Sequence, residues 1–183
     1  TGEDGGERMN PEQILTSFRE TLGDRLLEDR TVERSVGTID PKPVYDVWMA
    51  VEREDLHAAV AHLCAEFSPH LTVISGDDLG DRIAFNYHFT TGWGERYGEA
   101  TCTIRTVVPK DDLHLPTICD LLPGAQTTER EKHEFFGVEI EGIPDDRNLF
   151  LPEEMTIHPW RKDLEEETAE SVKRLVKWEA RDE

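Results

Sequence analysis

Glu129 and His133 are the pair of residues whose types and spacing could do chemistry in this sequence. They are four positions apart, so in a helix their side chains share one face. A carboxylate beside an imidazole can act as an acid–base pair or supply two ligands of a metal site. A metal needs further ligands, and His158 is the only nearby histidine. The pair supports one hypothesis, a small stand-alone acid–base or metal enzyme, but it is an incomplete constellation.

The residues around this pair have local structural explanations. Thr128 and Glu131 have the spacing of a capping box, which predicts a short helix that begins at Thr128. Gly137 suits the left-handed residue that ends such a helix. Phe136, with Phe135 before it, anchors the turn by burial. This pattern leaves three basic side chains without an assigned partner: Arg130, Lys132 and His133.

The composition limits the domain that must position this segment. The chain has 183 residues, enough for one domain with tails, and 40 acidic residues against 20 basic ones give a net charge of -20. This charge argues against nucleic-acid partners and against direct binding to anionic lipid. No apolar run approaches the roughly 20 residues of a membrane-spanning helix, and the first residues do not resemble a secretory signal. We therefore expect no nucleic-acid partner and no direct membrane insertion.

The cysteines do not have the spacing of a cofactor site. The sequence contains three of them, and none forms a CxxC pair with another: Cys64, Cys102 and Cys119. The usual iron–sulfur and zinc spacings are thus missing, and we expect this chain to bind no cofactor or metal. Small buried side chains in a reducing compartment are the simpler interpretation.

Periodicity predicts an α+β body. Apolar residues at helical spacing predict helices from Pro11, with Asn10 as its cap, and over 54–67. Alternation predicts strands, and Gly92–Gly98 has the composition of a hairpin loop between two of them. A short helix is expected from Pro116 to Leu122. The predicted strands cover residues 44–51, 71–74, 82–90 and 99–108.

The expected fold is therefore α+β, with an antiparallel-rich sheet of about four strands, helices on one face and an extended C-terminal docking tail. A disordered start would occupy 1–10, the α+β body 11–127, the docking segment 128–163 and an acidic helix 164–183. Trp178 on this last helix is expected to anchor it on a partner.

The docking segment resembles a known family. Glu129-Arg130-Glu131 followed by Phe136-Gly137 is similar to the hallmark of the 30-kDa subunit of respiratory complex I and of its relatives in membrane-bound [NiFe] hydrogenases. The family pattern continues with Gly-His-Pro-Asp, a Leu-Pro-Glu-like step and Pro-Leu-Arg-Lys-Asp. This chain has Gly142-Ile143-Pro144-Asp145, Leu151-Pro152-Glu153 and Pro159-Trp160-Arg161-Lys162-Asp163 in the same order.

The departures from the family pattern indicate a divergent, hydrogenase-type branch. Lys132 replaces an apolar residue, His133 an aromatic, Glu134 an aspartate, Ile143 a histidine and Trp160 a leucine. The resemblance implies a noncatalytic scaffold in the peripheral arm of a ferredoxin-linked, ion-pumping membrane complex. It implies a separate subunit, held on the cytoplasmic side of the membrane by its partners. The corresponding 30-kDa subunit of an NADH- or F420H2-quinone oxidoreductase is the alternative.

The resemblance also implies which chains lie next to this one. They are a large, 49-kDa-like subunit and a cluster-bearing small subunit, which carry iron–sulfur clusters with or without a NiFe centre. Arginine forks suit contacts with carboxylates of such neighbours, but Arg130 and Arg161 could equally pair within the chain. The candidate interface residues are Glu129, Arg130, Glu131, His133, Phe136, Gly137, Arg147, Pro159, Trp160, Arg161, Lys162, Asp163 and Trp178.

Overall fold

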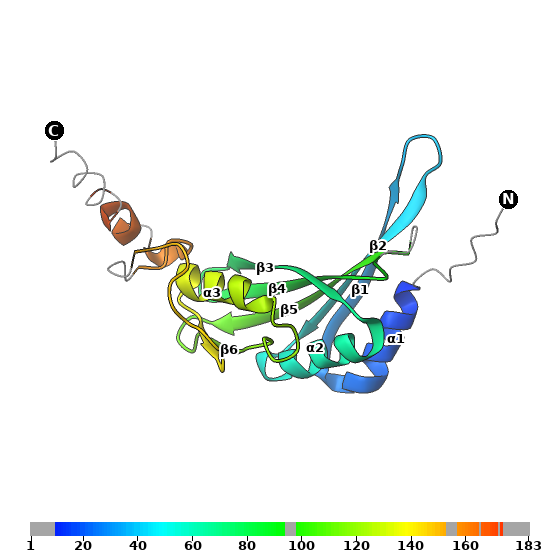
Figure 1. Ribbon diagram of the computed structural model, residues 1–183, viewed down its shortest axis with the longest axis horizontal. Coiled ribbons are helices and arrows are strands. Elements are labelled where there is room, and N and C mark those ends of the chain that lie inside the picture. Colours follow the sequence, from blue (N-terminus) through cyan, green and yellow to red (C-terminus); the bar gives the residue numbers. More distant parts are fainter. Residues whose placement is uncertain (1–9, 94–97, 153–156, 165, 172, 174–183) are drawn as a thin grey trace.

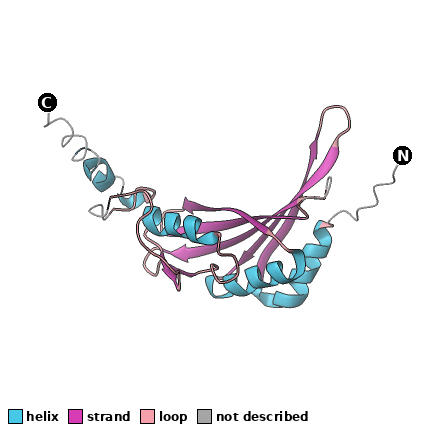
Figure 2. Cartoon of the chain, in the orientation of Figure 1, coloured by secondary structure: helices cyan, strands magenta, loops and turns pink. Residues whose placement is uncertain are grey.

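A five-stranded sheet with helices on one side forms the body of the protein (Figures 1 and 2). The structure is a computed structural model that describes residues 10–93, 98–152, 157–164, 166–171 and 173. The elements are α1 (Pro11–Leu22), β1 (Leu26–Val36), β2 (Lys42–Val51), α2 (Arg53–Phe67), β3 (His70–Asp78), β4 (Arg82–Thr91), β5 (Ala100–Pro109), β6 (His114–Pro116), α3 (Ala125–Phe136) and β7 (Glu139–Glu141), with short 3-10 turns at Gly23–Arg25 and Lys162–Leu164.

Helix α1 begins where the sequence predicts. The Asn10 side chain accepts a hydrogen bond from the Glu12 amide, and Pro11 occupies the first turn, where its missing N–H costs nothing. One face of α1 buries Ile14, Leu15, Phe18 and Leu22 against the sheet. The predicted disordered start at 1–10 otherwise lies outside the described residues.

The sheet is mixed, with strand order β1-β2-β5-β4-β3. Strands β2 and β5 run parallel, and the other three neighbouring pairs are antiparallel. The antiparallel-rich α+β fold is thus confirmed. The strand missing from the sequence prediction is β1, an edge strand rich in charged residues that has no regular alternation of burial.

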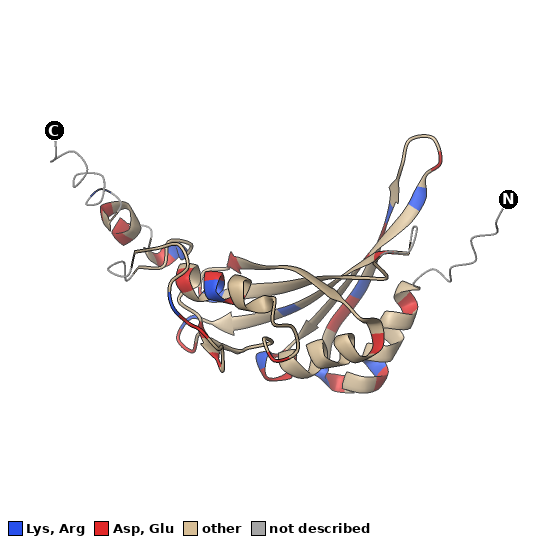
Figure 3. Cartoon of the chain, viewed as in Figure 1, with Lys and Arg blue, Asp and Glu red and all other residues tan. Residues whose placement is uncertain are grey.

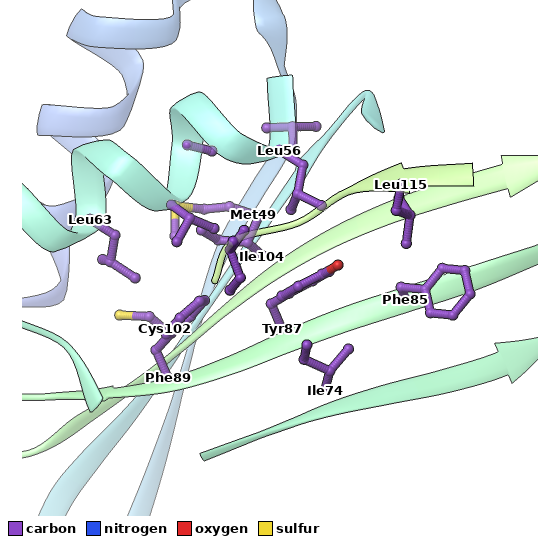
Figure 4. Close-up of a cluster of buried hydrophobic side chains, with 14 of the residues drawn as sticks. Met49, Leu56, Leu63, Ile74, Phe85, Tyr87, Phe89, Cys102, Ile104 and Leu115 are labelled. Carbon is purple, nitrogen blue, oxygen red and sulfur yellow. The ribbon is translucent and has the colours of Figure 1, made fainter. Parts of the chain in front are cut away.

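The core lies between the sheet and the helices. Alternate residues of β4 (Ile83, Phe85, Tyr87 and Phe89) point toward the helices, as the alternation predicts. Leu56 and Leu63 of α2 lie in the same buried cluster, together with Met49 of β2 and Ile104 of β5 (Figure 4). Cys102 and Cys119 are buried in this cluster, and Cys64 is half-buried beside it.

Two local predictions are wrong. The third strand reaches from His70 to Asp78, well beyond residue 74, because β4 pairs with it along this length. Pro116 does not begin a helix. It ends β6, which pairs in parallel with β7, and the next amide, that of Thr117, continues the ladder to the Glu141 carbonyl. The backbone at 114–117 is therefore extended by long-range pairing.

None of the helices among the described residues is both long and apolar enough to cross a bilayer.

Candidate functional site

Helix α3 and the chain that returns over it form the segment with the family-like motifs. The helix lies against strand β3 (Figure 1), and Phe136 packs edge-on against Phe85 of the core, at 5.8 Å between ring centroids. Gly76 of β3 makes this possible, because a Cβ at that position would collide with the Phe136 ring. The segment is therefore fixed to the body by its own first helix.

The predicted capping box is wrong. Helix α3 begins at Ala125, so Thr128 lies inside the helix and not at its start. The Thr128 hydroxyl accepts a hydrogen bond from the Ile74 amide of β3, at 3.2 Å. The Glu131 carboxylate pairs with the neighbouring Lys132 ammonium, at 2.5 Å. Thr128 and Glu131 thus do not bond to each other as a capping box would. Thr128 instead binds α3 to β3 at the edge of the sheet.

Glu129 is buried, and its carboxylate holds the turn that follows β6. It accepts hydrogen bonds from the Thr117 hydroxyl at 2.6 Å, the Ile118 amide at 2.8 Å and the Cys119 thiol at 3.1 Å. Burial raises the pKa of the Glu129 carboxyl, while these three donors act in the opposite direction. Glu129, the first residue of the Glu-Arg-Glu motif, therefore stabilises the turn after β6 by hydrogen bonds within the chain. This turn lies where the sequence predicted a helix.

Arg130 binds the chain that returns past the helix. Its guanidinium donates to the carbonyl oxygens of Arg147 and Asn148, at 2.8 and 3.0 Å, and lies 3.4 Å from the Asp145 carboxylate. Asp145 also accepts from the Arg147 guanidinium, and these contacts hold the pKa of Asp145 well below its usual range. The aspartate of Gly-Ile-Pro-Asp therefore pairs with the arginine of Glu-Arg-Glu within one chain.

Glu134 anchors the returning chain, a contact that the sequence prediction missed. Its buried carboxylate accepts hydrogen bonds from the amides of three consecutive residues, Leu149, Phe150 and Leu151. Successive backbone amides that converge on one carboxylate form an anion-binding nest. The only signal in the sequence was that an acidic residue stands where the family pattern has aspartate. Its partners lie 15 to 17 residues away, which no local pattern reveals.

We expect Glu134→Gln to lower the free energy of unfolding by about 2 kcal/mol, because the amide side chain loses the charge that three amides share. Chemical denaturation measures this loss, and limited proteolysis should show faster cleavage near Leu151. Glu139→Gln, at an exposed position of β7, is the control and should leave both measurements unchanged. Equal losses in the two variants would contradict the role of the nest.

Gly137 ends α3 as predicted, in the left-handed conformation with φ 73°. His158 lies directly on this glycine and donates from Nδ1 to the Glu134 carbonyl oxygen, at 2.9 Å. His133 donates in the same way to the Val138 carbonyl oxygen, at 2.8 Å. Each of the two histidines therefore uses a ring N–H to satisfy a backbone carbonyl at the end of the helix.

An aromatic stack covers the outer side of α3. Trp160 stacks on Phe135 at 4.4 Å and meets the edge of Phe136 at 5.4 Å, and Phe150 stacks on Phe135 at 5.9 Å. The buried Lys132 ammonium lies 4.6 Å from the Trp160 ring, a cation–π distance. Two departures from the family pattern, Lys132 and Trp160, thus contact each other. Phe150 is 65% exposed and Trp160 42% exposed, so the stack reaches the surface.

Asp78 at the end of β3 holds the Arg-Lys-Asp motif. Its carboxylate accepts from the Lys162 amide at 2.8 Å and pairs with Lys110 at 2.7 Å, and Lys162 Nζ donates to the Asp78 carbonyl oxygen. Burial acts to raise the pKa of Asp78, but these donors outweigh it and the pKa is lowered. Lys110 also pairs with Asp163, at 2.6 Å. The motif is therefore tied to the sheet through a residue that the sequence prediction did not single out.

Arg161 pairs with Asp163, with two hydrogen bonds of 3.1 and 2.5 Å. The internal pairing that the sequence left open for Arg161 is thus observed, and its partner is Asp163. The Arg161 guanidinium, together with Lys110, holds the pKa of Asp163 well below its usual range.

These depressed carboxyl pKa values predict how the tail responds to acid. The stabilisation is complete above the unfolded pKa of about 4, and it is lost as the pH falls from there toward the lower folded values. We expect the Trp160 indole NMR signal to keep its position through the usual carboxyl range and to shift only below it. Asp163→Asn should weaken this dependence on pH. Asp77→Asn, on the exposed neighbour of Asp78, should not.

The structure brings most of the predicted interface residues together on α3 and its returning chain. Pro159, beside Trp160, is half-buried, whereas Arg147 lies at the surface. Trp178 lies outside the described residues, as does most of the helix predicted over 164–183. The part of that range that the structure describes as helix is 166–171 and 173. Glu129 and His133 do not bond to each other, and no cluster of metal-ligating side chains is found among the described residues. The acid–base hypothesis gains no support from this geometry.

The fold and the site define an α+β domain whose C-terminal segment is folded back and locked onto its own helix. Residues 49–170 match the family described as the 30 Kd subunit of respiratory-chain NADH dehydrogenase. The protein belongs to this family.

Relatives come from two kinds of complex. The chain is 33% identical over 134 residues to NADH-quinone oxidoreductase subunit 5 of Thermus thermophilus, covering 68% of this chain. This match spans 64% of the length of the Thermus protein. The chain is also 33% identical over 131 residues to the membrane-bound hydrogenase subunit beta of Pyrococcus furiosus, covering 69% of this chain and 75% of that protein.

Solved structures agree on the fold. A chain in the membrane-bound sulfane sulfur reductase, an archaeal respiratory membrane complex, superposes with a TM-score of 0.66 at 19% identity, covering 88% of this chain and 91% of that one. The trypsin-resistant fragment of Nqo5 superposes with a TM-score of 0.55 at 27% identity, covering 73% and 97%. The α+β fold is thus shared with both kinds of respiratory protein.

Proposed function

We propose that this protein is a noncatalytic scaffold subunit in the peripheral arm of a complex I-related membrane redox complex. In that role, residues 128–163 dock the large subunit beside the cluster-bearing small subunit, on the cytoplasmic side of the membrane. The redox centres, iron–sulfur clusters with or without a NiFe centre, belong to those neighbours. This chain supplies shape and position, and no step of the electron transfer passes through its own residues.

One observation carries the proposal: the charged residues of the motifs are used internally, while aromatic rings are left at the surface. Glu129, Arg130 and Asp163 all bond within the chain, so they hold the segment in one conformation. Phe150 and Trp160 reach solvent from the same stack. A rigid surface with exposed aromatic rings is typical of a protein interface. The sequence suggested that these charged residues contact partner subunits directly. In this proposal they instead hold the docking segment in the conformation that presents the aromatic rings.

Within the family we propose the hydrogenase-type, ferredoxin-linked and ion-pumping branch. The alternative is the 30-kDa subunit of an NADH- or F420H2-quinone oxidoreductase, which the Thermus relative favours at the same identity as the hydrogenase relative. Assays of the assembled complex separate the two. Evolution of hydrogen from reduced ferredoxin supports the first, and reduction of quinone supports the second.

Co-purification tests the scaffold role. Expressed with its neighbouring reading frames, the chain should elute with a large and a small subunit in equal amounts. Phe150→Ser should reduce this recovery without changing the melting temperature, because the ring is exposed. Ile39→Ser, at a side chain that is 99% exposed on the β1–β2 hairpin, is the matched control. An isolated monomer with catalytic turnover of its own would overturn the proposal.

A further inference from the structure

Strand β3 is the last strand at its end of the sheet, and no further strand pairs with its outer edge in the described chain. In an antiparallel ladder, successive residues face alternately toward the partner strand and away from it. The Leu79 amide bonds to the Arg82 carbonyl oxygen at 2.9 Å, so this pair faces inward and fixes the alternation. The residues of β3 whose backbone groups face away from β4 are therefore Ile74, Gly76 and Asp78.

The chain itself satisfies the outward backbone groups only at the two ends of this row. The Thr128 hydroxyl accepts a hydrogen bond from the Ile74 amide at 3.2 Å, and Lys162 Nζ donates to the Asp78 carbonyl oxygen at 2.7 Å. Between these two contacts, four groups make no hydrogen bond within the described residues: the Ile74 carbonyl, the amide and carbonyl of Gly76, and the Asp78 amide. Unpaired backbone groups along a strand edge are a template for another strand.

A groove of about 550 Å³ runs along this part of the edge, between β3 and α3 (Figure 1). One wall is the strand itself, residues 73–78. The other wall consists of side chains from α3 and the returning chain: Glu131, Lys132, Phe136, Trp160 and Lys162. We call this hollow the β3 groove. A groove between an edge strand and a facing wall of side chains is suited to an extended peptide that adds to the sheet.

The lining of the β3 groove favours an apolar occupant with no strong charge of its own. Figure 3 shows both signs of charge on α3. The buried charges of Lys132 and Asp78 are each paired within the chain. The rings of Phe136 and Trp160 supply apolar surface beside the unpaired backbone groups. The β3 groove therefore offers backbone hydrogen bonds and apolar contact, which an extended chain can use together.

The β3 groove is continuous with the docking segment. Trp160 lines the groove and also stacks on Phe135, and it is 42% exposed. On the strand, Val73 is 41% exposed and Gly76 is half-buried, so the edge can be reached from outside. A partner that rests on the aromatic stack therefore has the edge of β3 beside it.

We propose that the β3 groove binds an extended segment of a partner subunit as an added strand. The segment bonds to the backbone of Gly76 and packs an apolar side chain against Phe136 and Trp160. An extended segment of about five residues spans all the unpaired groups. This inference rests on the proposed function, because it requires that the protein works inside a complex. It states how the partner holds the docking segment: by joining the sheet next to it.

Hydrogen exchange tests the added strand at single amides. In the isolated chain the Gly76 amide has no acceptor and should exchange rapidly. In the complex purified with the large and small subunits, we expect this amide to exchange roughly tenfold more slowly or better, because the added strand supplies a carbonyl acceptor. Ser75 and Asp77, whose amides face β4, are internal controls and should exchange slowly in both samples.

The outcomes separate this inference from the scaffold role. A complex that forms but leaves Gly76 exchange unchanged would overturn the added strand and leave the scaffold role intact. Slow exchange of Gly76 in the isolated chain would also overturn it, because this chain would then fill the groove itself. If no complex forms, both the scaffold role and the added strand are overturned.

A lysine at the edge gives an independent test, because lysine on an edge strand hinders strand addition. Val73→Lys should abolish the slowing of Gly76 exchange in the complex and leave the melting temperature unchanged, since the side chain is exposed. Leu79→Lys is the matched control: Leu79 is 44% exposed, lies outside the β3 groove, and its variant should behave as the parent. Full protection of Gly76 in Val73→Lys would show that the partner does not lie along β3 and would contradict the proposal.

Discussion

Glu129→Ala is expected to lower the free energy of unfolding by about 3 kcal/mol, because it removes the acceptor of a buried amide and leaves a cavity. The carboxylate accepts hydrogen bonds from Thr117, Ile118 and Cys119, and the Ile118 side chain is fully buried in the core. Denaturant titration measures the change. The same substitution at Glu20, exposed on α1, is the control and should stay within about 0.5 kcal/mol of the parent.

The raised pKa of Glu129 adds a dependence on pH. A carboxyl whose folded pKa lies above its unfolded value binds the proton more tightly in the folded state. Its contribution to stability is therefore complete below the unfolded pKa of about 4.3 and is lost as the pH rises through the folded pKa. We expect Glu129→Gln to remove this part of the stability–pH profile. An unchanged slope in that variant would contradict the direction of the shift.

Gly137→Ala is expected to cost about 2–4 kcal/mol, through backbone strain and a steric clash together. The left-handed φ of 73° disfavours any L side chain, and a Cβ here would lie 2.5 Å from His158 Cδ2. Since His158 cannot move without losing its bond to the Glu134 carbonyl, the chain at 157–160 should detach from α3. A thermal melt gives the loss of stability, and faster proteolysis after Arg161 gives the detachment.

Two further variants separate strain from clash. Gly124→Ala, at the other end of the helix with φ -65° and nothing within 4 Å of the added methyl group, should be close to neutral. Adding His158→Ala to Gly137→Ala removes the clash and should leave only the backbone term, about 1–2 kcal/mol, plus the lost hydrogen bond. Strictly additive losses in the double variant would show that the two residues do not interact.

Much of the body follows from periodicity. Strands β4 and β5 alternate strongly, and α1 has both a capping residue and an N-terminal proline, so local signals and tertiary structure agree there. Strand β1 escapes prediction because one of its edges is free and most of its side chains are exposed, which removes the alternation. The extended backbone at Pro116 escapes prediction because β7, more than 20 residues later, pairs with it.

The site was located by its motifs, but its bonding was not predictable from them. Local spacing suggested that Thr128 caps Glu131, whereas the helix begins earlier and Thr128 serves β3 instead. The partners of Arg130 and Glu134 belong to a loop that lies more than ten residues downstream. The role of Asp78 depends on contact with Lys162, 84 residues away. Of the three residues expected to cap α3, Gly137 alone was predicted correctly, because its conformation is set locally.

The position of β5 between β2 and β4 has a consequence for biosynthesis. Strands β3, β4 and β5 are consecutive and can pair as soon as they are made, whereas β2 joins the sheet only through β5, about 50 residues later. Until residue 109 has left the ribosome, the β1–β2 hairpin lacks its neighbour β5, and the backbone N–H and C=O groups along the inner edge of β2 have no partner strand. We therefore expect nascent chains that stop before β5 to recruit chaperones, and chains that extend past it to be released from them.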